Sequence, residues 1–127
     1  MFKRILLAYD GSEGAKLALG KAAEMATAFA AELHILAVGR IPEYAETVSE
    51  VEEALHGLKE RGLAGQSRID FGKPGDVILR IAEDLSVDLI IMGTKPHSPL
   101  RRRFLGATVD KVIDHAHCSV LVVRSDA

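Results

Sequence analysis

VDLIIMGTKPHSPLRRRFLGATVDKVIDHAHCSVLVVR, the stretch from Val87 to Arg124, decides the fold of this chain. An apolar run ends at Gly93, a polar loop follows, and Gly106 opens a helical stretch that leads into the apolar run Ser119–Val123. A strand, a glycine, a basic loop and a helix N-terminus are together typical of a phosphate cradle, because backbone N–H groups and the helix dipole both favour an anion. The stretch therefore predicts an anion site between a strand and a helix.

The rest of the chain alternates in the same way between strand-like and helix-like apolar patterns. The expected strands are Ile5–Tyr9, Leu33–Val38, Ser67–Phe71, Val87–Met92 and Ser119–Val123. The expected helices begin at Ser12, at Ala45 (to about Arg61), at Pro74 and before Val109. Nearly unbroken apolar strands that alternate with helices favour an α/β fold with a parallel sheet covered on both faces.

Length and composition exclude several classes of protein. A chain of 127 residues predicts one domain, residues 1–127, with a sizeable core. The net charge of −2 gives no electrostatic footprint for nucleic acid or an anionic membrane. The N-terminus resembles neither a signal peptide nor a membrane span. The single cysteine, Cys118, excludes an internal disulfide framework and suits the reducing cytoplasm.

Polar and glycine residues gather after two of the expected strands. Asp10-Gly11-Ser12 follows the first strand, and Gly93-Thr94-Lys95 follows the fourth. Parallel sheets bind ligands beyond the carboxyl ends of their strands, where the strand order reverses. If the first and fourth strands are neighbours, the two segments face one crevice.

Three segments resemble the universal stress protein family. They are ILLAYDGSEGAKLAL at 5–19, GKPGDVILRIAEDLSVDLIIMG at 72–93 and HAHCSVLVV at 115–123. Each segment is a weak signal alone, but their order and spacing are specific, and the resemblance extends over nearly the whole chain. It implies a five-stranded parallel sheet in the order 3-2-1-4-5, usually in a homodimer. Many members of the family bind ATP.

ATP-binding members carry a glycine, two residues, a second glycine, nine residues, a third glycine and then serine or threonine. Gly93 and Gly106 match the first and third glycines. The second glycine is replaced by Pro96, which lacks an N–H donor and has a fixed φ. The hydroxyl position is Ala107, and a hydroxyl follows one place later at Thr108. The chain therefore resembles a family member whose phosphate half is impaired.

The resemblance also implies nucleoside contacts for Asp10 and Val38, and Met92 precedes the first glycine of the motif. The predicted nucleotide-binding residues are Asp10, Val38, Met92, Gly93, Gly106 and Thr108. Each has a simpler structural interpretation: Asp10 suits the turn before the first helix, and Gly93 suits a close helix–sheet contact. Arg101–Arg103 offer replacement phosphate donors, although a solvated basic loop is the commoner role of such a run.

Other chemistry finds little support in the sequence. His115, His117 and Cys118 form an H-x-H-C cluster whose spacing matches no closed zinc site, so a structural role is favoured. No nucleophile stands beside an evident base, so we expect no catalytic residue. A phospho-receiver domain shares the α/β alternation, but Asp70 lies inside its strand and no lysine follows the last strand.

The sequence predicts a cytoplasmic, universal-stress-like regulatory or binding protein involved in stress response, with weak or absent ATP binding. The alternative is a switch that binds ATP or AMP, with or without slow hydrolysis. In the implied strand order Ser119–Val123 is an edge of the sheet, and an apolar edge favours pairing with a second copy. We therefore expect a homodimer through Ser119–Val123, together with a protein partner that the sequence does not name.

Overall fold

The computed structural model describes residues 1–39, 42–94 and 106–124, in which strands and helices alternate as the sequence predicts. The strands are β1 (Arg4–Ala8), β2 (Glu32–Gly39), β3 (Gln66–Phe71), β4 (Leu89–Gly93) and β5 (Ser119–Val123). The helices are α1 (Glu13–Phe29), α2 (Tyr44–Glu60), α3 (Pro74–Asp84) and α4 (Ala107–His115). No helix in these ranges combines the length and apolarity needed to cross a bilayer.

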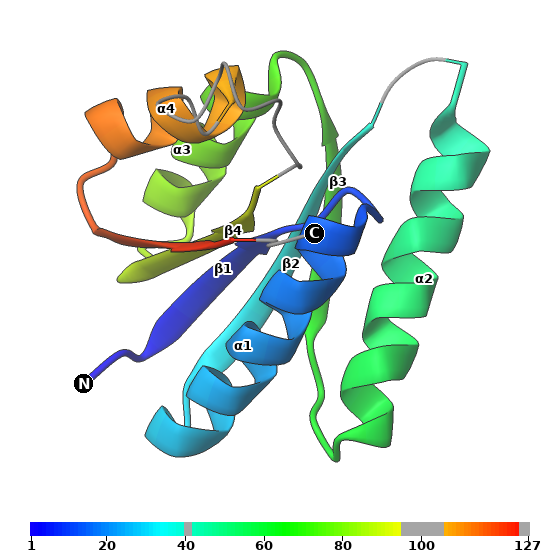
Figure 1. The fold of residues 1–127 in the computed structure, drawn as a ribbon, viewed down its shortest axis with the longest axis vertical. Coiled ribbons are helices and arrows are strands. Elements are labelled where there is room, and N and C mark those ends of the chain that lie inside the picture. The colour runs from blue at the N-terminus through cyan, green and yellow to red at the C-terminus, as the bar shows by residue number, and fades with distance from the viewer. Residues whose placement is uncertain (40–41, 95–105, 125–127) are drawn as a thin grey trace.

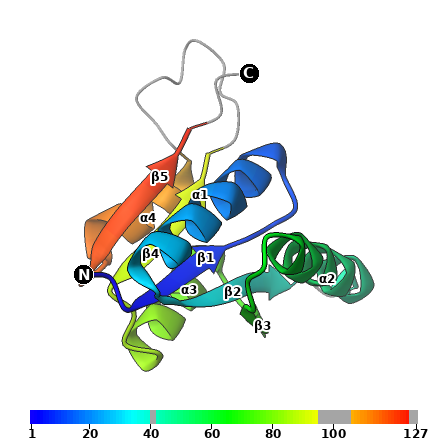
Figure 2. The same cartoon turned by 90° about the horizontal axis from the view of Figure 1, so that it is seen from below.

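The five strands form one parallel sheet in the order β3-β2-β1-β4-β5, which confirms the expected order (Figure 2). The chain runs outward from β1 to β3 and then returns to β4 on the other side of β1. In register, Leu6 of β1 lies between His34 of β2 and Ile90 of β4. A receiver-type sheet instead places its first strand between the second and third, so this order excludes that alternative.

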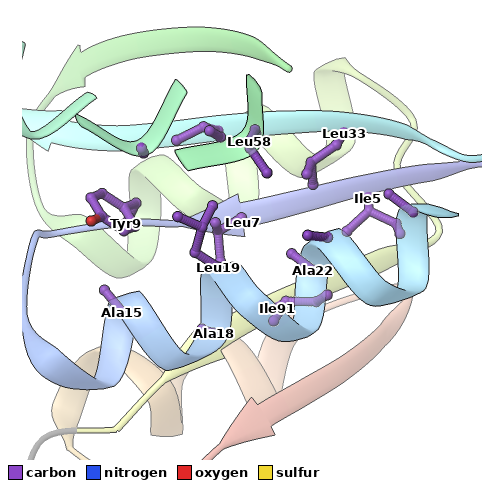
Figure 3. Packing of buried hydrophobic residues seen from close by; sticks show 14 of the residues in the cluster. Ile5, Leu7, Tyr9, Ala15, Ala18, Leu19, Ala22, Leu33, Leu58 and Ile91 are labelled. Carbon is purple, nitrogen blue, oxygen red and sulfur yellow. The ribbon is translucent and has the colours of Figure 1, made fainter. Parts of the chain in front are cut away.

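Helices cover both faces of the sheet, with α1 and α2 on one face and α3 and α4 on the other (Figure 1). Small side chains let α1 lie close to the sheet, where larger aliphatic side chains of the strands fill the space (Figure 3). The buried alanines of α1 are Ala15, Ala18, Ala22, Ala23 and Ala26. On the opposite face, Val77 and Ile81 of α3 and Val112 of α4 pack against β1 and β4.

The fourth strand begins two residues later than the sequence suggests. Ser86 has a φ of 52°, and the N–H of Val87 donates to the carbonyl oxygen of Ala82 at 3.0 Å. Val87 therefore ends α3 rather than starting the strand, because its N–H satisfies a carbonyl of the last helical turn. The pairing of β4 with β1 starts at Leu89, opposite Ile5.

Edge strand β3 is polar on the face that it shares with α3. Its residues Gln66, Arg68 and Asp70 are in register with the inward-facing residues of β2. The N–H of Phe71 donates to Asp70 at 2.9 Å, and this bond, together with Arg80 at 3.1 Å, holds the pKa of Asp70 below its usual value. Asp70 is thus held in a structural ion pair at the edge of the sheet.

Candidate functional site

A cavity of about 500 Å³ opens at the carboxyl ends of the central strands, beside the first turns of the helices. Strand β1 lies between β2 and β4, so the carboxyl ends of these three parallel strands lie side by side there. All six residues predicted from the sequence line the cavity: Asp10, Val38, Met92, Gly93, Gly106 and Thr108. The structure therefore brings together residues that lie up to 98 positions apart in the chain, from Asp10 to Thr108.

Asp10 shapes the turn between β1 and α1. Its carboxylate accepts a hydrogen bond from the N–H of Ser12 at 3.0 Å. The hydroxyl of Ser12 in turn accepts from the N–H of Ala15 at 3.1 Å and caps α1. The structural interpretation of Asp10 is therefore confirmed, while its carboxylate also belongs to the cavity lining, where a ligand role stays a prediction.

The end of β4 touches the first turn of α1 backbone to backbone. A β-carbon built on Gly14 would overlap the carbonyl oxygen of Thr94, and one built on Gly93 would overlap the carbonyl group of Gly14. No side chain fits between the two segments. The close helix–sheet contact expected of Gly93 is confirmed, and its role toward phosphate stays a prediction.

The start of α4 offers backbone donors to the cavity. Gly106 precedes the helix with a φ of 112°, a conformation that disfavours side chains although open space surrounds its α-carbon. Among the described residues no side chain caps the start of this helix, and its first residue, Ala107, lines the cavity beside Thr108. The first N–H groups of a helix lack intrahelical partners, so this terminus suits an anion.

The lining also contains acidic residues that sequence reasoning missed. Glu43 precedes α2, and Glu46 and Glu50 follow at helical spacing; all three line the cavity. A possible signal was the spacing of three and four residues, which places side chains on one helix face. The apolar stripe that contains Val51 and Leu58 was visible in the sequence. The sequence did not indicate that the acidic residues of α2 would point toward the cavity.

The carboxylates shift the pKa values of their neighbours. Burial, followed by the charges of Asp10, Glu53, Glu46 and Glu43, raises the pKa of Glu50 above its usual value. Burial, followed by the charges of Glu53, Glu50, Asp10 and Glu13, likewise raises the pKa of Tyr9. Negative charge is therefore concentrated at this side of the cavity, and Glu50 binds a proton more readily than an isolated glutamate.

The structure does not test every candidate from the sequence. Arg101–Arg103 and Pro96 are outside the described residues. The ring nitrogen Nδ1 of His115 lies 3.0 Å from the carbonyl oxygen of Lys111, one helical turn earlier. Across residues 1–39, 42–94 and 106–124, no group of three or more histidine, cysteine, aspartate or glutamate side chains is arranged to hold a metal ion.

Known proteins are similar to this chain in both sequence and fold. Residues 1–124 match the family model described as the universal stress protein family. The chain belongs to the universal stress protein family. A universal stress protein of Thermus aquaticus is 39% identical over 138 residues, which cover 98% of this chain and 100% of the relative. One from Methanocaldococcus jannaschii is 32% identical, over 98% of this chain and 83% of the relative.

Among solved structures, a universal stress protein in complex with cAMP matches with a TM-score of 0.84 and 26% sequence identity, over 97% of each chain. The recognition of this universal stress protein from its sequence is thus confirmed, and so is its sheet order. The replacement of the motif hydroxyl by Ala107 falls at the first residue of α4, inside the cavity lining.

Proposed function

We propose that this universal stress protein is a cytoplasmic regulatory or binding protein of the stress response, rather than an enzyme. Its cavity takes the nucleoside part of an adenine ligand and holds ATP weakly or not at all. The observation that carries the proposal is the convergence of Asp10, Val38 and Met92 with Gly93, Gly106 and Thr108 on one cavity. A relative solved with cAMP supports a ligand that contains adenosine.

The lining explains why the two halves of an adenine nucleotide should be treated differently. Val38 and Met92 are aliphatic, and Asp10 offers a carboxylate to sugar hydroxyls, which suits a nucleoside. Ala107 has no hydroxyl for a phosphate oxygen, and Pro96 has no N–H donor. Hydrogen bonds to a charged group are stronger than neutral ones, so the loss of two donors weakens phosphate binding.

Isothermal titration of the unmodified protein tests this proposal. We expect ATP to bind no more tightly than adenosine, because the triphosphate gains little from the altered motif. Binding of ATP at low micromolar concentration, tighter than adenosine, would contradict the proposal. That outcome would favour the alternative of an ATP or AMP switch, and mass spectrometry of ligand released from denatured protein would identify the nucleotide.

Restoring the motif should restore the phosphate site. The double variant Pro96→Gly plus Ala107→Ser should bind ATP more tightly by about 1–3 kcal/mol, since it regains a backbone donor and a hydroxyl. Titration with ATP and adenosine measures the change. Thr108→Ser is the control, because it keeps a hydroxyl next to Ala107 and should leave ATP affinity near its original value. Equal gains for ATP and adenosine would contradict a phosphate-specific effect.

We also propose that two copies associate through β5, residues Ser119–Val123, as the apolar edge of the sheet. Strand order leaves one side of β5 without a neighbour among the described strands. Val120, Leu121, Val122 and Val123 are each only partly buried, and two antiparallel copies would cover the same patch on both chains. We also expect a further protein partner, which the sequence does not name.

A further inference from the structure

One wall of the cavity is acidic, and its residues come from the N-terminal part of α2 and the residue before it. We use acidic wall for Glu43, Glu46 and Glu50, which are three and four positions apart and all line the cavity. Glu50 lies deepest against the backbone: a β-carbon built on Gly11 would be 2.9 Å from its Cγ atom. Glu50 therefore lies against the turn that carries Asp10, a fourth carboxylate of the lining.

The fixed charges of the described lining are mostly negative. Its residues include four carboxylates but neither lysine nor arginine among the described positions. Helices α1, α2, α3 and α4 all begin at the cavity, and each N-terminus contributes roughly half a positive charge, about two charges together. These partial charges do not balance four carboxylates. The nearby ammonium of Lys16 is already shared between Glu13 and Glu53, at 3.7 Å from each.

A ligand in the cavity lies close to these negative charges. A cavity of this volume is only about 10 Å across, which is close to one Debye length at physiological salt. Any phosphate bound inside it therefore lies within about one Debye length of the acidic wall, so salt weakens their repulsion but does not remove it. A neutral nucleoside does not incur this repulsion.

We propose that the acidic wall makes the cavity select adenine ligands by phosphate charge, so that a nucleoside or a singly charged cyclic monophosphate is preferred to a triphosphate. This selection rests on the proposed function, because it presumes that the cavity holds the nucleoside. It acts through Glu46 and Glu50 as specificity-determining residues and is independent of Pro96 and Ala107. The expected ligand is an adenine nucleoside or a nucleotide whose phosphate carries a single negative charge.

Proton uptake follows from the same geometry. Burial already raises the pKa of Glu50, and so do the charges that face it: Asp10 from the β1–α1 turn, Glu53 and Glu46 from α2, and Glu43 just before α2. Because an anionic ligand adds to their repulsion, it raises the pKa further and draws a proton onto the carboxylate. ATP affinity should therefore increase as the pH falls through the titration range of Glu50.

The test is titration calorimetry with adenosine, cAMP and ATP on the unmodified protein and on Glu46→Gln plus Glu50→Gln. Affinity of the unmodified protein should fall along that series of ligands. In the double variant the ratio of ATP to adenosine affinity should rise roughly tenfold, which is the size expected when two like charges near a multiply charged ligand are removed. The variant should also lose the proton uptake that accompanies ATP binding to the unmodified protein. Titration in buffers of different ionisation enthalpy measures this uptake.

The matched control is Glu52→Gln plus Glu83→Gln, which changes the net charge equally at exposed positions outside the described lining. Its affinity ratio should equal that of the unmodified protein. An equal rise in both double variants, or a rise in neither, would overturn the selection by the acidic wall even when adenosine binds. If no ligand binds any of the proteins, the proposed function itself fails, and the selection fails with it.

Discussion

Replacing Gly14 by alanine should lower the free energy of unfolding by about 3 kcal/mol or more, because no room exists for a β-carbon at the junction of α1 and β4. The added carbon would overlap the carbonyl oxygen of Thr94, which is backbone at the end of β4. Backbone cannot swing aside as a flexible side chain does, so the helix must shift from the sheet. A fall of about 10 °C in the melting temperature corresponds to this loss for a chain of this length.

Gly20→Ala is the matched control, because it makes the same chemical change on the same helix. A β-carbon there would meet only the guanidinium of Arg61 at 3.5 Å, an ordinary contact. Alanine favours helix over glycine by about 0.5–1 kcal/mol, so this variant should be as stable as the original or more so. Thermal and urea unfolding of both variants measures the contrast, and similar stabilities would show that α1 does not approach β4 this closely.

Replacing Val122 by proline should convert the proposed dimer into a monomer that keeps its fold. The N–H of Thr94 donates to the carbonyl oxygen of Val123 at 3.0 Å, so the backbone groups of Val123 face β4. Backbone groups alternate in direction along a strand, so those of Val122 face the open edge. Proline at that position removes a donor only from pairing with a second copy, and edge strands tolerate it.

Leu121→Pro is the corresponding control. The backbone groups of Leu121 face β4, so proline there removes an N–H donor to β4 and should destabilise the monomer itself. Sedimentation at micromolar concentration should find a dimer for the unmodified chain and a rise of about a hundredfold or more in the dissociation constant for Val122→Pro. Circular dichroism should show that this variant stays folded. An unmodified monomer at that concentration would refute the interface, and a dimer insensitive to Val122→Pro would locate it elsewhere.

The fold was predictable because its signals are local and repeated. Strands buried on both faces read as nearly unbroken apolar runs, and β4 with Leu89, Ile90 and Ile91 is the strongest case. The start of β4 was wrong by two residues, since the end of α3 depends on the left-handed conformation of Ser86. Such a terminus is decided by hydrogen bonds to the preceding turn rather than by apolar periodicity.

Part of the candidate site was also accessible from the sequence. Parallel strands end at the same edge, so polar residues after two neighbouring strands must meet, as Asp10 and Gly93 do. The resemblance to the family added Val38, Gly106 and Thr108, which line the same cavity. None of these placements required knowledge of how the helices lie.

The sequence by itself thus determined the alternation of strands and helices, the family and the strand ends at which a ligand would sit. The tertiary structure alone decided that Gly14 and Gly93 touch, and that Glu43, Glu46 and Glu50 line one cavity with Asp10. The physical reason is the range of the interactions. Periodicity records which face of an element is apolar, but the direction of its polar face depends on how α2 packs across the sheet.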